Sequence, residues 1–312
     1  MHDKPLVSIV TPVYNQERYV EDTIKSVLSQ TYSPIEYIVI NDGSTDGSLS
    51  IIEQYRGMLK VIDQANHGQA ATLNRGWSEC SGQFIGYLSS DDLLAPNCIE
   101  RLMSVLLENN DAVCVYPDCN LISPEGAVLK GGVCRPFILE ELVIGQECYI
   151  GPGALWRADL HSQIGGWKPE LRLAPDREYW MRLSKMGRFH FVRETLAGYR
   201  LHPDSISYKE VSEEVSREYL TVLDDYFLSG DVPDSIASRR LEAYANAHWL
   251  IARNMFRGGF YVRGTQYLRD ALRTDMSTLT ARRIYQLIRS TIGKPIRMLM
   301  SKIHRWKVGR SA

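Results

Sequence analysis

Several features that would assign a chain to a common class are missing from this 312-residue sequence. No run approaches the roughly 18 consecutive apolar residues of a membrane-spanning helix. The first ten residues, MHDKPLVSIV, lack the long apolar stretch of a secretory signal, so we expect a cytoplasmic protein. None of the six cysteines stands in a C-x-x-C pair, which disfavours a zinc or redox site and indicates reduced, buried thiols.

Acidic residues are absent from Met276 to Ala312, a stretch that carries nine Lys and Arg side chains. From Ile284 onward, apolar and basic residues interleave around Pro295, which is typical of an amphipathic helix on an anionic membrane surface. A solvated terminal helix that packs on the domain would show the same pattern. No fold-level motif supports nucleic-acid binding, so we expect no nucleic-acid partner. Peripheral binding at the inner face of the cytoplasmic membrane is therefore a hypothesis.

The composition is that of an ordinary globular protein, with 44% apolar and 23% charged residues. The first half alternates short β-rich runs with amphipathic segments, which predicts an α/β fold with an open sheet flanked by helices. We expect strands at 6–10, 35–40, 60–62, 84–88, 112–116, 189–192 and 196–201, and helices at 17–29, 46–55, 69–80, 97–108 and 176–186. After about Lys209 long helical patterns dominate. We therefore expect domains at 1–208 and 209–312, the second a mainly helical extension.

The first two predicted strands end in residues suited to a nucleotide. Strand one stops at Thr11-Pro12 with Tyr14 just beyond, and strand two stops at the N-D-G-S sequence that contains Asp42. Ligands of open α/β sheets bind at the carboxyl ends of the strands. Tyr14 offers a flat face for a base, and Asp42 a carboxylate that can accept a ring N–H. A plain turn and helix cap would also use D-G-S-T-D, so both interpretations stay open.

The fourth predicted strand ends in YLSSDD, with adjacent carboxylates at Asp91 and Asp92. Two such groups at the end of a buried strand repel one another, and a divalent cation relieves this repulsion. The alternative is a solvated acidic pair at a helix start, before Pro96.

Together these segments resemble a known family. VSIVTPVYNQERYVEDTIKSVLSQTYSPIEYIVINDGSTDGS, followed by NHGQAATLNRG and LSSDD, closely resembles the family 2 inverting glycosyltransferases of GT-A fold, over residues 6 to about 207. No G-x-G-x-x-G follows strand one, which disfavours a nicotinamide-binding domain. The resemblance implies a nucleotide-binding GT-A-like sheet and a bacterial surface-polysaccharide enzyme.

The resemblance also implies a nucleotide site. Pro12 and Tyr14 match the base-stacking loop of the family, and Asp42 its base-binding aspartate. The segment that lines the nucleotide cleft in the family is matched by Asn66, Gly68 and Asn74. His67, between the first two, is a weaker candidate for a pyrophosphate contact.

A divalent metal, Mn²⁺ or Mg²⁺, is implied by the D-x-D-like motif. Asp92 matches the residue expected to contact the metal, and Asp91 one that binds the ribose or the metal. Family members often have aspartate where this chain has Ser89, which makes the ligand set less certain. His202, in YRLHPDSIS, resembles a histidine that some relatives place near the metal or diphosphate, although a histidine before proline is more often a loop residue.

The catalytic base is implied by LAPDREYWMRLSKMG. Asp176 matches the aspartate of the family's acidic and aromatic segment, and Pro175 replaces its usual glutamate. A carboxylate there would deprotonate the acceptor hydroxyl as it attacks the anomeric carbon. A helix-capping role for Asp176 is compatible with this. Trp156 and Trp167 could line an acceptor site, and core packing explains them equally well.

The sequence thus predicts the inverting transfer of one sugar from a nucleoside-diphosphate sugar, in the first place a UDP-sugar, to a hydroxyl of a glycan or lipid-linked acceptor. The polymerising relatives carry membrane spans and a Q-x-x-R-W motif, and neither occurs here. The alternative is a catalytically inactive member that acts as a nucleotide-binding or scaffold subunit. A sugar-phosphate nucleotidyltransferase is disfavoured, because T-P-V-Y-N stands where its Gly-rich basic loop would follow strand one. The donor, acceptor and oligomeric state are undetermined by sequence.

Overall fold

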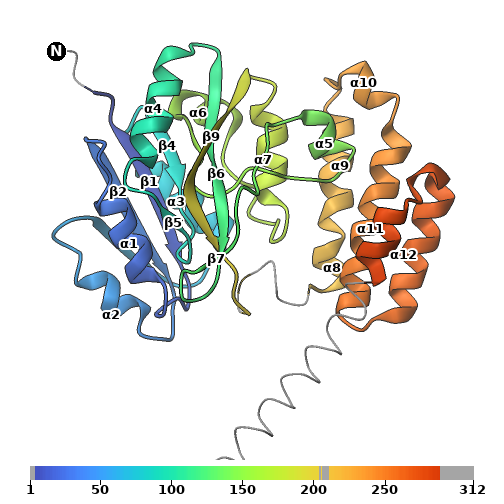
Figure 1. Ribbon diagram of the computed structural model, residues 1–312, viewed down its shortest axis with the longest axis horizontal. Helices are drawn as coiled ribbons and strands as arrows, with labels where there is room; N and C mark the ends of the chain where they lie inside the picture. Colours follow the sequence, from blue (N-terminus) through green and yellow to red (C-terminus); the bar gives the residue numbers. More distant parts are fainter. Residues whose placement is uncertain (1–3, 204, 206–210, 289–312) are drawn as a thin grey trace, which may run out of the picture. The chain divides into compact units, whose positions relative to one another are not determined.

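The computed structural model describes residues 4–203, 205 and 211–288 of the chain (Figure 1). The chain divides into two compact units. Residues 1–139 and 148–208 form an α/β unit, and residues 140–147 and 209–312 form a helical unit. The division at Tyr208 falls where the sequence changes character, but the helical unit also takes Glu140–Glu147 from within the first expected domain. Beyond residue 288, the predicted basic tail lies outside the described residues.

One mixed sheet organises the α/β unit. Its order in the described part of the chain is β3 (Lys60–Gln64), β2 (Ile35–Asp42), β1 (Val7–Val13), β4 (Phe84–Tyr87), β8 (Leu155–Arg157), β6 (Ala112–Ile122), β9 (Arg188–Arg200) and β5 (Leu93–Leu94), with β7 (Val128–Lys130) paired to β6. The open α/β sheet predicted from sequence is confirmed. Strand β1 runs one residue past Pro12, and the short strands β5, β7 and β8 were not predicted.

The first four strands are parallel, and β1 lies between β2 and β4. All seven residues of β1 are buried, including the polar Ser8 and Thr11, as expected for a strand between two parallel neighbours. The chain adds strands outward from β1 to β2 and β3, and then crosses back to β4 on the other side of β1. The direction of winding therefore reverses between β1 and β4, and ligands of open α/β sheets bind at the carboxyl ends of strands at such a point.

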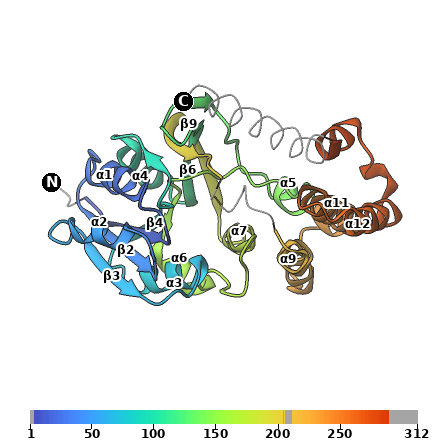
Figure 2. The same cartoon turned by 90° about the horizontal axis from the view of Figure 1, so that it is seen from below.

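Helices cover both faces of this sheet (Figure 2). On one face lie α1 (Val20–Leu28) and α4 (Cys98–Glu108), and on the other lie α3 (Gln69–Ser78), α6 (Ala158–Ile164) and α7 (Pro175–Leu183); α2 (Ser48–Glu53) follows β2. Helix α1 buries Val20, Ile24 and Val27 on one side, which is the helical spacing read from the sequence.

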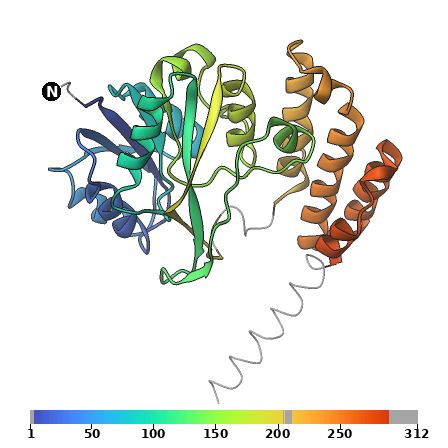
Figure 3. The ribbon, with the colours of Figure 1, turned by 45° about the horizontal axis from the view of Figure 1, so that its top comes forward.

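Two long strands extend the sheet beyond β8. β6 and β9 run parallel and side by side from Ala112↔Arg188 to Ile122↔Arg200, with register shifts around Asp118 (Figure 3). The sequence predicted two separate short strands where β9 is continuous. Because β9 continues to Arg200, its end reaches the loop that follows β4, where Arg200 donates to Asp91 and Asp92.

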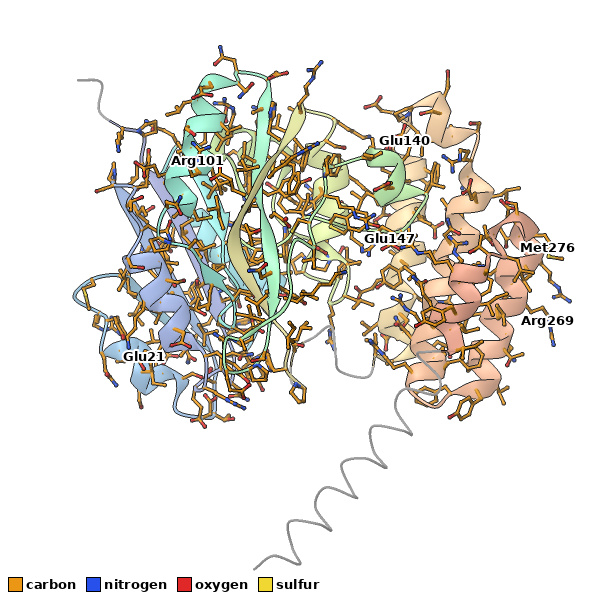
Figure 4. All side chains as sticks on the ribbon, in the orientation of Figure 1. Glu21, Arg101, Glu140, Glu147, Arg269 and Met276 are labelled. Atoms are coloured by element: carbon orange, nitrogen blue, oxygen red, sulfur yellow. The ribbon has the colours of Figure 1, made fainter. Side chains whose placement is uncertain are left out.

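The helical unit is built from two separate parts of the chain. Its main part contains α8 (Glu213–Ser216), α9 (Glu218–Leu228), α10 (Asp234–Ala237), α11 (Arg240–Arg257), α12 (Tyr261–Thr274) and the short 3₁₀ helix η1 (Met276–Thr278). Glu140 and Glu147, labelled in Figure 4, mark the ends of the other part, which follows the start of α5 (Leu139–Val143). Asn246 Nδ2 donates to the Ile144 carbonyl at 2.7 Å and ties the two parts together. Within the described residues, no helix combines the length and apolarity needed to cross a bilayer.

Candidate functional site

The loops after β1 and β2 are fastened to each other at the carboxyl edge of the sheet. Asn15 Oδ1 accepts from the Thr45 amide at 2.7 Å, and Ser48 Oγ accepts from the Gln16 amide at 2.8 Å. Tyr14, which directly follows β1, is 49% exposed and keeps a face open to solvent. Pro12 lies inside β1 and is buried, so of the two predicted base-stacking residues only Tyr14 presents a ring surface.

Asp42, the last residue of β2, is buried and holds the loop that precedes α3. Its carboxylate accepts from the backbone amides of His67 at 2.8 Å and Gly68 at 2.9 Å, and from Gln64 Nε2 at 2.8 Å. A carboxylate offers about four acceptor positions, so three are taken and about one remains for a ligand. This geometry fixes the N-H-G loop beside the ends of β2 and β3, and leaves Asn66, His67 and Gly68 exposed.

Asn74, predicted to line the nucleotide cleft, is engaged elsewhere. Its Oδ1 accepts from the Trp167 amide at 2.8 Å and its Nδ2 donates to the Trp167 carbonyl at 2.7 Å. Gly166 packs so closely that an added Cβ would lie 2.2 Å from Asn74 Oδ1. Asn74 therefore clamps the Gly165-Gly166 turn against α3, a contact that links residues 93 positions apart in sequence.

Replacing Asn74 by alanine is expected to destabilise the fold and to leave nucleotide affinity within about threefold of wild type. Both backbone groups of Trp167 lose their partners, and an unsatisfied buried polar group costs roughly 1–3 kcal/mol. Urea denaturation measures the loss. Asn97→Ala is the matched control, because the Asn97 side chain caps no backbone group of α4 in the described structure. A large loss of nucleotide affinity with unchanged stability would contradict this prediction.

The two carboxylates after β4 have different surroundings. Asp92 is only 3% exposed, and its Oδ1 accepts from the Arg200 amide at 2.9 Å. Its own carbonyl accepts from Thr23 Oγ1 at 2.8 Å. Burial, together with the neighbouring charge of Asp91, holds the pKa of Asp92 well above its ordinary value. The more accessible group is the Asp91 carboxylate, whose side chain is 16% exposed.

Asp91 and His202 form a close pair. Asp91 Oδ2 and His202 Nε2 are 2.9 Å apart, and the His202 ring packs on Tyr19 with centroids 4.6 Å apart. His202 Nδ1 is buried and has no partner among the residues that the structure describes. The fold thus brings His202 beside the acidic motif, across 111 positions of sequence.

Arg200 holds this pair in place and was missed from the sequence. Its Nε donates to the Asp91 carbonyl at 2.8 Å, and its guanidinium lies 4.9 Å from the Tyr19 ring centroid. Another of its nitrogens donates to the Pro124 carbonyl at 2.6 Å. No motif marks an arginine for this role, and only its position two residues before His202 could have drawn notice.

The chemistry of the Asp91 and His202 donors fits a divalent metal that is shared with a ligand. Within the described residues, no group of three or more His, Cys, Asp or Glu side chains could hold an ion alone. Mn²⁺ accepts carboxylate and imidazole donors, and Mg²⁺ is commonly held by one or two carboxylates together with substrate phosphates. One carboxylate and one imidazole would fill only part of the coordination sphere of such an ion.

Asp176 lies in the first turn of α7, where Pro175 begins the helix without sacrificing a hydrogen bond. Burial raises the pKa of Asp176 above its ordinary value, and the neighbouring Arg177 opposes this rise. Farther along α7, Arg182 forms a two-pronged ion pair with Glu178 and donates to the Gly166 carbonyl at 2.7 Å. The Gly165-Gly166 turn is therefore held by Asn74 of α3 through Trp167 and by Arg182 of α7 through the Gly166 carbonyl.

Tyr87 connects the two acidic regions. Burial raises the pKa of its hydroxyl well above the ordinary value, and the charges of Asp176 and Asp92 raise it further. Trp77 contacts both the Tyr87 ring and Tyr179 of α7, so the end of β4 packs toward the helix that carries Asp176. The ring packs against Trp156 and Trp167, which are 0% and 3% exposed. These tryptophans therefore belong to the core, and the acceptor-wall alternative for them is not borne out.

Comparison with known proteins gives a consistent relationship. The sequence profile of glycosyl transferase family 2 matches residues 8–129. Chondroitin synthase of Pasteurella multocida (strain Pm70) is 29% identical over 226 residues, which cover 71% of this chain and 23% of that protein. The chain thus spans about a quarter of the length of this relative.

Two solved structures share the fold. Residues 1–349 of S. aureus TarS, in complex with UDP-GlcNAc, match at a TM-score of 0.58 and 17% identity, over 88% of this chain and 93% of that one. The mannosyltransferase PcManGT of Pyrobaculum calidifontis, in complex with GDP-Man and Mn²⁺, matches at 0.61 and 16% identity, over 96% of this chain and 84% of that one. At this identity the likeness establishes the fold, which is GT-A-like with added C-terminal helices.

Proposed function

The chain carries a glycosyl transferase family 2 domain at residues 8–129, and on this premise we propose that it is an inverting, metal-dependent glycosyltransferase. It would move one sugar from a nucleoside-diphosphate sugar to a hydroxyl of a glycan or lipid-linked acceptor. The observation that carries the proposal is the gathering of Tyr14, Asp42 and Asp91 at the ends of the adjacent strands β1, β2 and β4. Asp176 lies at the start of α7, and this helix packs through Tyr179 on Trp77, which also contacts Tyr87 at the end of β4.

The nucleotide would lie over the ends of β1 and β2. The exposed Tyr14 ring provides a stacking surface, and the remaining acceptor position of Asp42 suits a ring N–H of uracil, thymine or guanine. The exposed loop 66–68, which Asp42 holds, presents polar groups beside this position. Most of Asp42's hydrogen bonds serve the loop, so we assign it a positioning role as well as a binding one.

Asp91 and His202 would hold the divalent metal. The metal offsets the negative charge that develops on the departing diphosphate. We assign direct contact to Asp91 rather than to Asp92, which the sequence alone favours. Asp92 Oδ1 accepts from the Arg200 amide, so this carboxylate positions the loop instead.

Asp176 would act as the general base. It takes the proton of the acceptor hydroxyl as that oxygen attacks the anomeric carbon from the face opposite the diphosphate, which inverts the configuration. A base is most effective when its pKa approaches the working pH. Burial moves the pKa of Asp176 in this direction.

Calorimetric titration with UDP, GDP, dTDP and CMP, each with and without Mn²⁺, tests the proposal. We expect one diphosphate to bind in a Mn²⁺-dependent manner, and the Mn²⁺ effect to disappear in Asp91→Ala. Asp159→Ala, which removes an exposed acid in the first turn of α6, serves as the control and should bind as wild type does. Binding of none of the four would contradict the proposal. Mn²⁺-dependent binding without sugar release from any nucleotide sugar would favour the alternative, an inactive nucleotide-binding subunit.

Peripheral membrane binding depends on the basic tail, most of which lies beyond the described residues. Co-sedimentation with anionic vesicles of the full chain and of a chain ending at Ile288 tests it. Equal partition of the two proteins would reject the hypothesis and remove the argument for a lipid-linked acceptor.

A further inference from the structure

Tyr87, at the end of β4, carries a hydroxyl for which the described residues offer no hydrogen-bond partner. Its ring is enclosed by aromatic neighbours, with centroids 6.2 Å from Trp77 and 5.1 Å from Trp167. Tyrosine hydroxyls on rings packed among other aromatic side chains usually have a hydrogen-bond partner. The Tyr87 hydroxyl has none among the residues that the structure describes. The side chain is partly exposed, and its oxygen is not among the fully buried, unpartnered polar atoms of the described residues, so a ligand can reach it.

The position of Tyr87 places this hydroxyl at the reversal point of the sheet. It is the last residue of β4 and is in register with Val10 of β1. The chain then turns directly into the S-S-D-D loop that carries Asp91. Asn74 and Arg182 fix the turn that leads to Trp167, so the wall behind the Tyr87 ring is rigid.

The neighbours of the Tyr87 ring indicate what its hydroxyl faces. Trp77 packs on Tyr87, with centroids 6.2 Å apart, and also on Tyr179, with centroids 6.3 Å apart, and Tyr179 lies three residues after Asp176 in α7. On the other side, Asp91 follows Tyr87 by four residues. Asp176 and Asp92 both oppose its ionisation, so it stays protonated at any ordinary pH and can only serve as a neutral donor or acceptor. It is therefore unsuited to being a second base. In the proposed reaction, Asp176 lies beside the acceptor hydroxyl, whereas Asp92 belongs to the loop that would bind the metal and the diphosphate.

An inverting displacement aligns the attacking oxygen, the anomeric carbon and the leaving oxygen. The base lies at one end of this line and the metal pair at the other, so the sugar ring lies between them. We propose that the Tyr87 hydroxyl donates a hydrogen bond to a hydroxyl of the transferred sugar and helps to select which sugar is accepted. This inference rests on the proposed function and names a substrate contact within the same site.

Tyr87→Phe removes one oxygen and keeps the ring, so the packing against the tryptophans is preserved. The first step measures release of nucleoside diphosphate from UDP-glucose, UDP-N-acetylglucosamine, UDP-galactose and GDP-mannose with Mn²⁺ and water as acceptor. The second step repeats the measurement with monodeoxy analogues of the productive donor, on wild type and Tyr87→Phe. Calorimetric affinity for the free diphosphate is measured in parallel. Tyr32→Phe is the matched control, because it loses a hydrogen bond to the Pro5 carbonyl, at the entrance to the first strand.

We expect Tyr87→Phe to lower kcat/KM for the productive donor roughly 3- to 10-fold, the usual worth of one neutral hydrogen bond. For wild type, one deoxy analogue should lower kcat/KM by a similar factor. For Tyr87→Phe, the same analogue should lower kcat/KM no further, because both changes remove the same hydrogen bond. Affinity for the free diphosphate should be unchanged. The Tyr32→Phe control should lose stability and keep the wild-type donor preference.

Three results would overturn the inference. Tyr87→Phe with wild-type kinetics would show that the hydroxyl touches no substrate. Equal additional losses for all deoxy analogues, together with weaker diphosphate binding, would indicate a structural role. A wild-type protein that binds and cleaves no nucleotide sugar would reject this inference together with the proposed function, whereas the first two results reject the inference alone.

Discussion

Replacing Asp176 by asparagine is expected to lower sugar transfer roughly 100- to 10,000-fold, the usual contribution of a general base. The amide cannot take the acceptor proton, while the nucleotide and metal groups at the other end of the site remain intact. Diphosphate affinity should therefore stay within about threefold of wild type. Steady-state kinetics and calorimetry together separate the two quantities, and a parallel loss of both would contradict the assignment.

The same substitution is expected to stabilise the protein at neutral pH. Burial raises the pKa of Asp176 in the folded state above its value near 3.8 in the unfolded chain. Protonation is thus favoured by folding, so the stability it contributes is complete below pH 3.8 and is lost as the pH rises through the folded pKa. Above the folded pKa, wild type therefore carries a penalty that Asp176→Asn avoids.

Thermal melts of both proteins between pH 4 and 8 measure this effect. The advantage of Asp176→Asn should be largest at pH 7–8 and shrink toward pH 4. Asp159→Asn, a change at an exposed acid in α6, should melt as wild type does at every pH. The kcat/KM of wild type should fall on the acidic side with an inflection above pH 3.8, because the base must be ionised. An advantage that is independent of pH would rule out the carboxylate as its source.

The neighbouring carboxylates Asp91 and Asp92 are expected to behave differently on substitution. Asp91→Asn should weaken Mn²⁺-dependent diphosphate binding about 100-fold or more, since loss of an outer-shell partner alone costs about 10- to 100-fold. Asp92→Asn should change it less than about threefold. An asparagine at position 92 can keep the oxygen that accepts from the Arg200 amide, and this acceptor role is what the structure assigns to Asp92.

Mn²⁺ electron paramagnetic resonance with UDP or the productive diphosphate reads out metal binding without catalysis. Chelation by EDTA should reduce wild-type diphosphate affinity to the level of Asp91→Asn, and should have little effect on Asp91→Asn itself. His202→Gln provides a second test, because it removes the imidazole donor and keeps a polar side chain of similar reach. Equal losses in the asparagine variants at positions 91 and 92 would restore the assignment that the sequence alone favours, with Asp92 on the metal.

Local pattern was enough to predict much of the sheet. The β-rich run in β1 and the helical spacing in α1 are short-range signals, and both elements overlap the expected ranges. β5 and β8 were missed because two or three residues carry no periodicity. β9 was divided in two, because its pairing with β6 depends on residues about 80 positions earlier in the chain.

The site was predicted by resemblance for its motif residues, and only tertiary contacts could refine it. Asn74 is held by Trp167, and Asp92 by Arg200, across 93 and 108 positions. Such partners leave no local trace in the sequence. Tyr87 was overlooked because a tyrosine in a strand is ordinary, and it is distinguished only by a hydroxyl at the end of β4 that has no hydrogen-bond partner among the described residues.

The helical unit takes Glu140–Glu147 from the middle of the α/β sequence, so it is assembled from two stretches of the chain. Ile144, Leu142 and Val143 are almost fully buried, and the hydrogen bond from Asn246 to Ile144 joins these stretches. A single cut near Tyr208 would therefore not release a self-contained catalytic module, because it would strip the cover from an apolar segment. Exchange of this helical unit between homologous proteins, by recombination or in chimaeras, would have to transfer both stretches together. We therefore expect the helical unit to evolve together with the segment Glu140–Glu147, which lies within the sequence of the α/β unit.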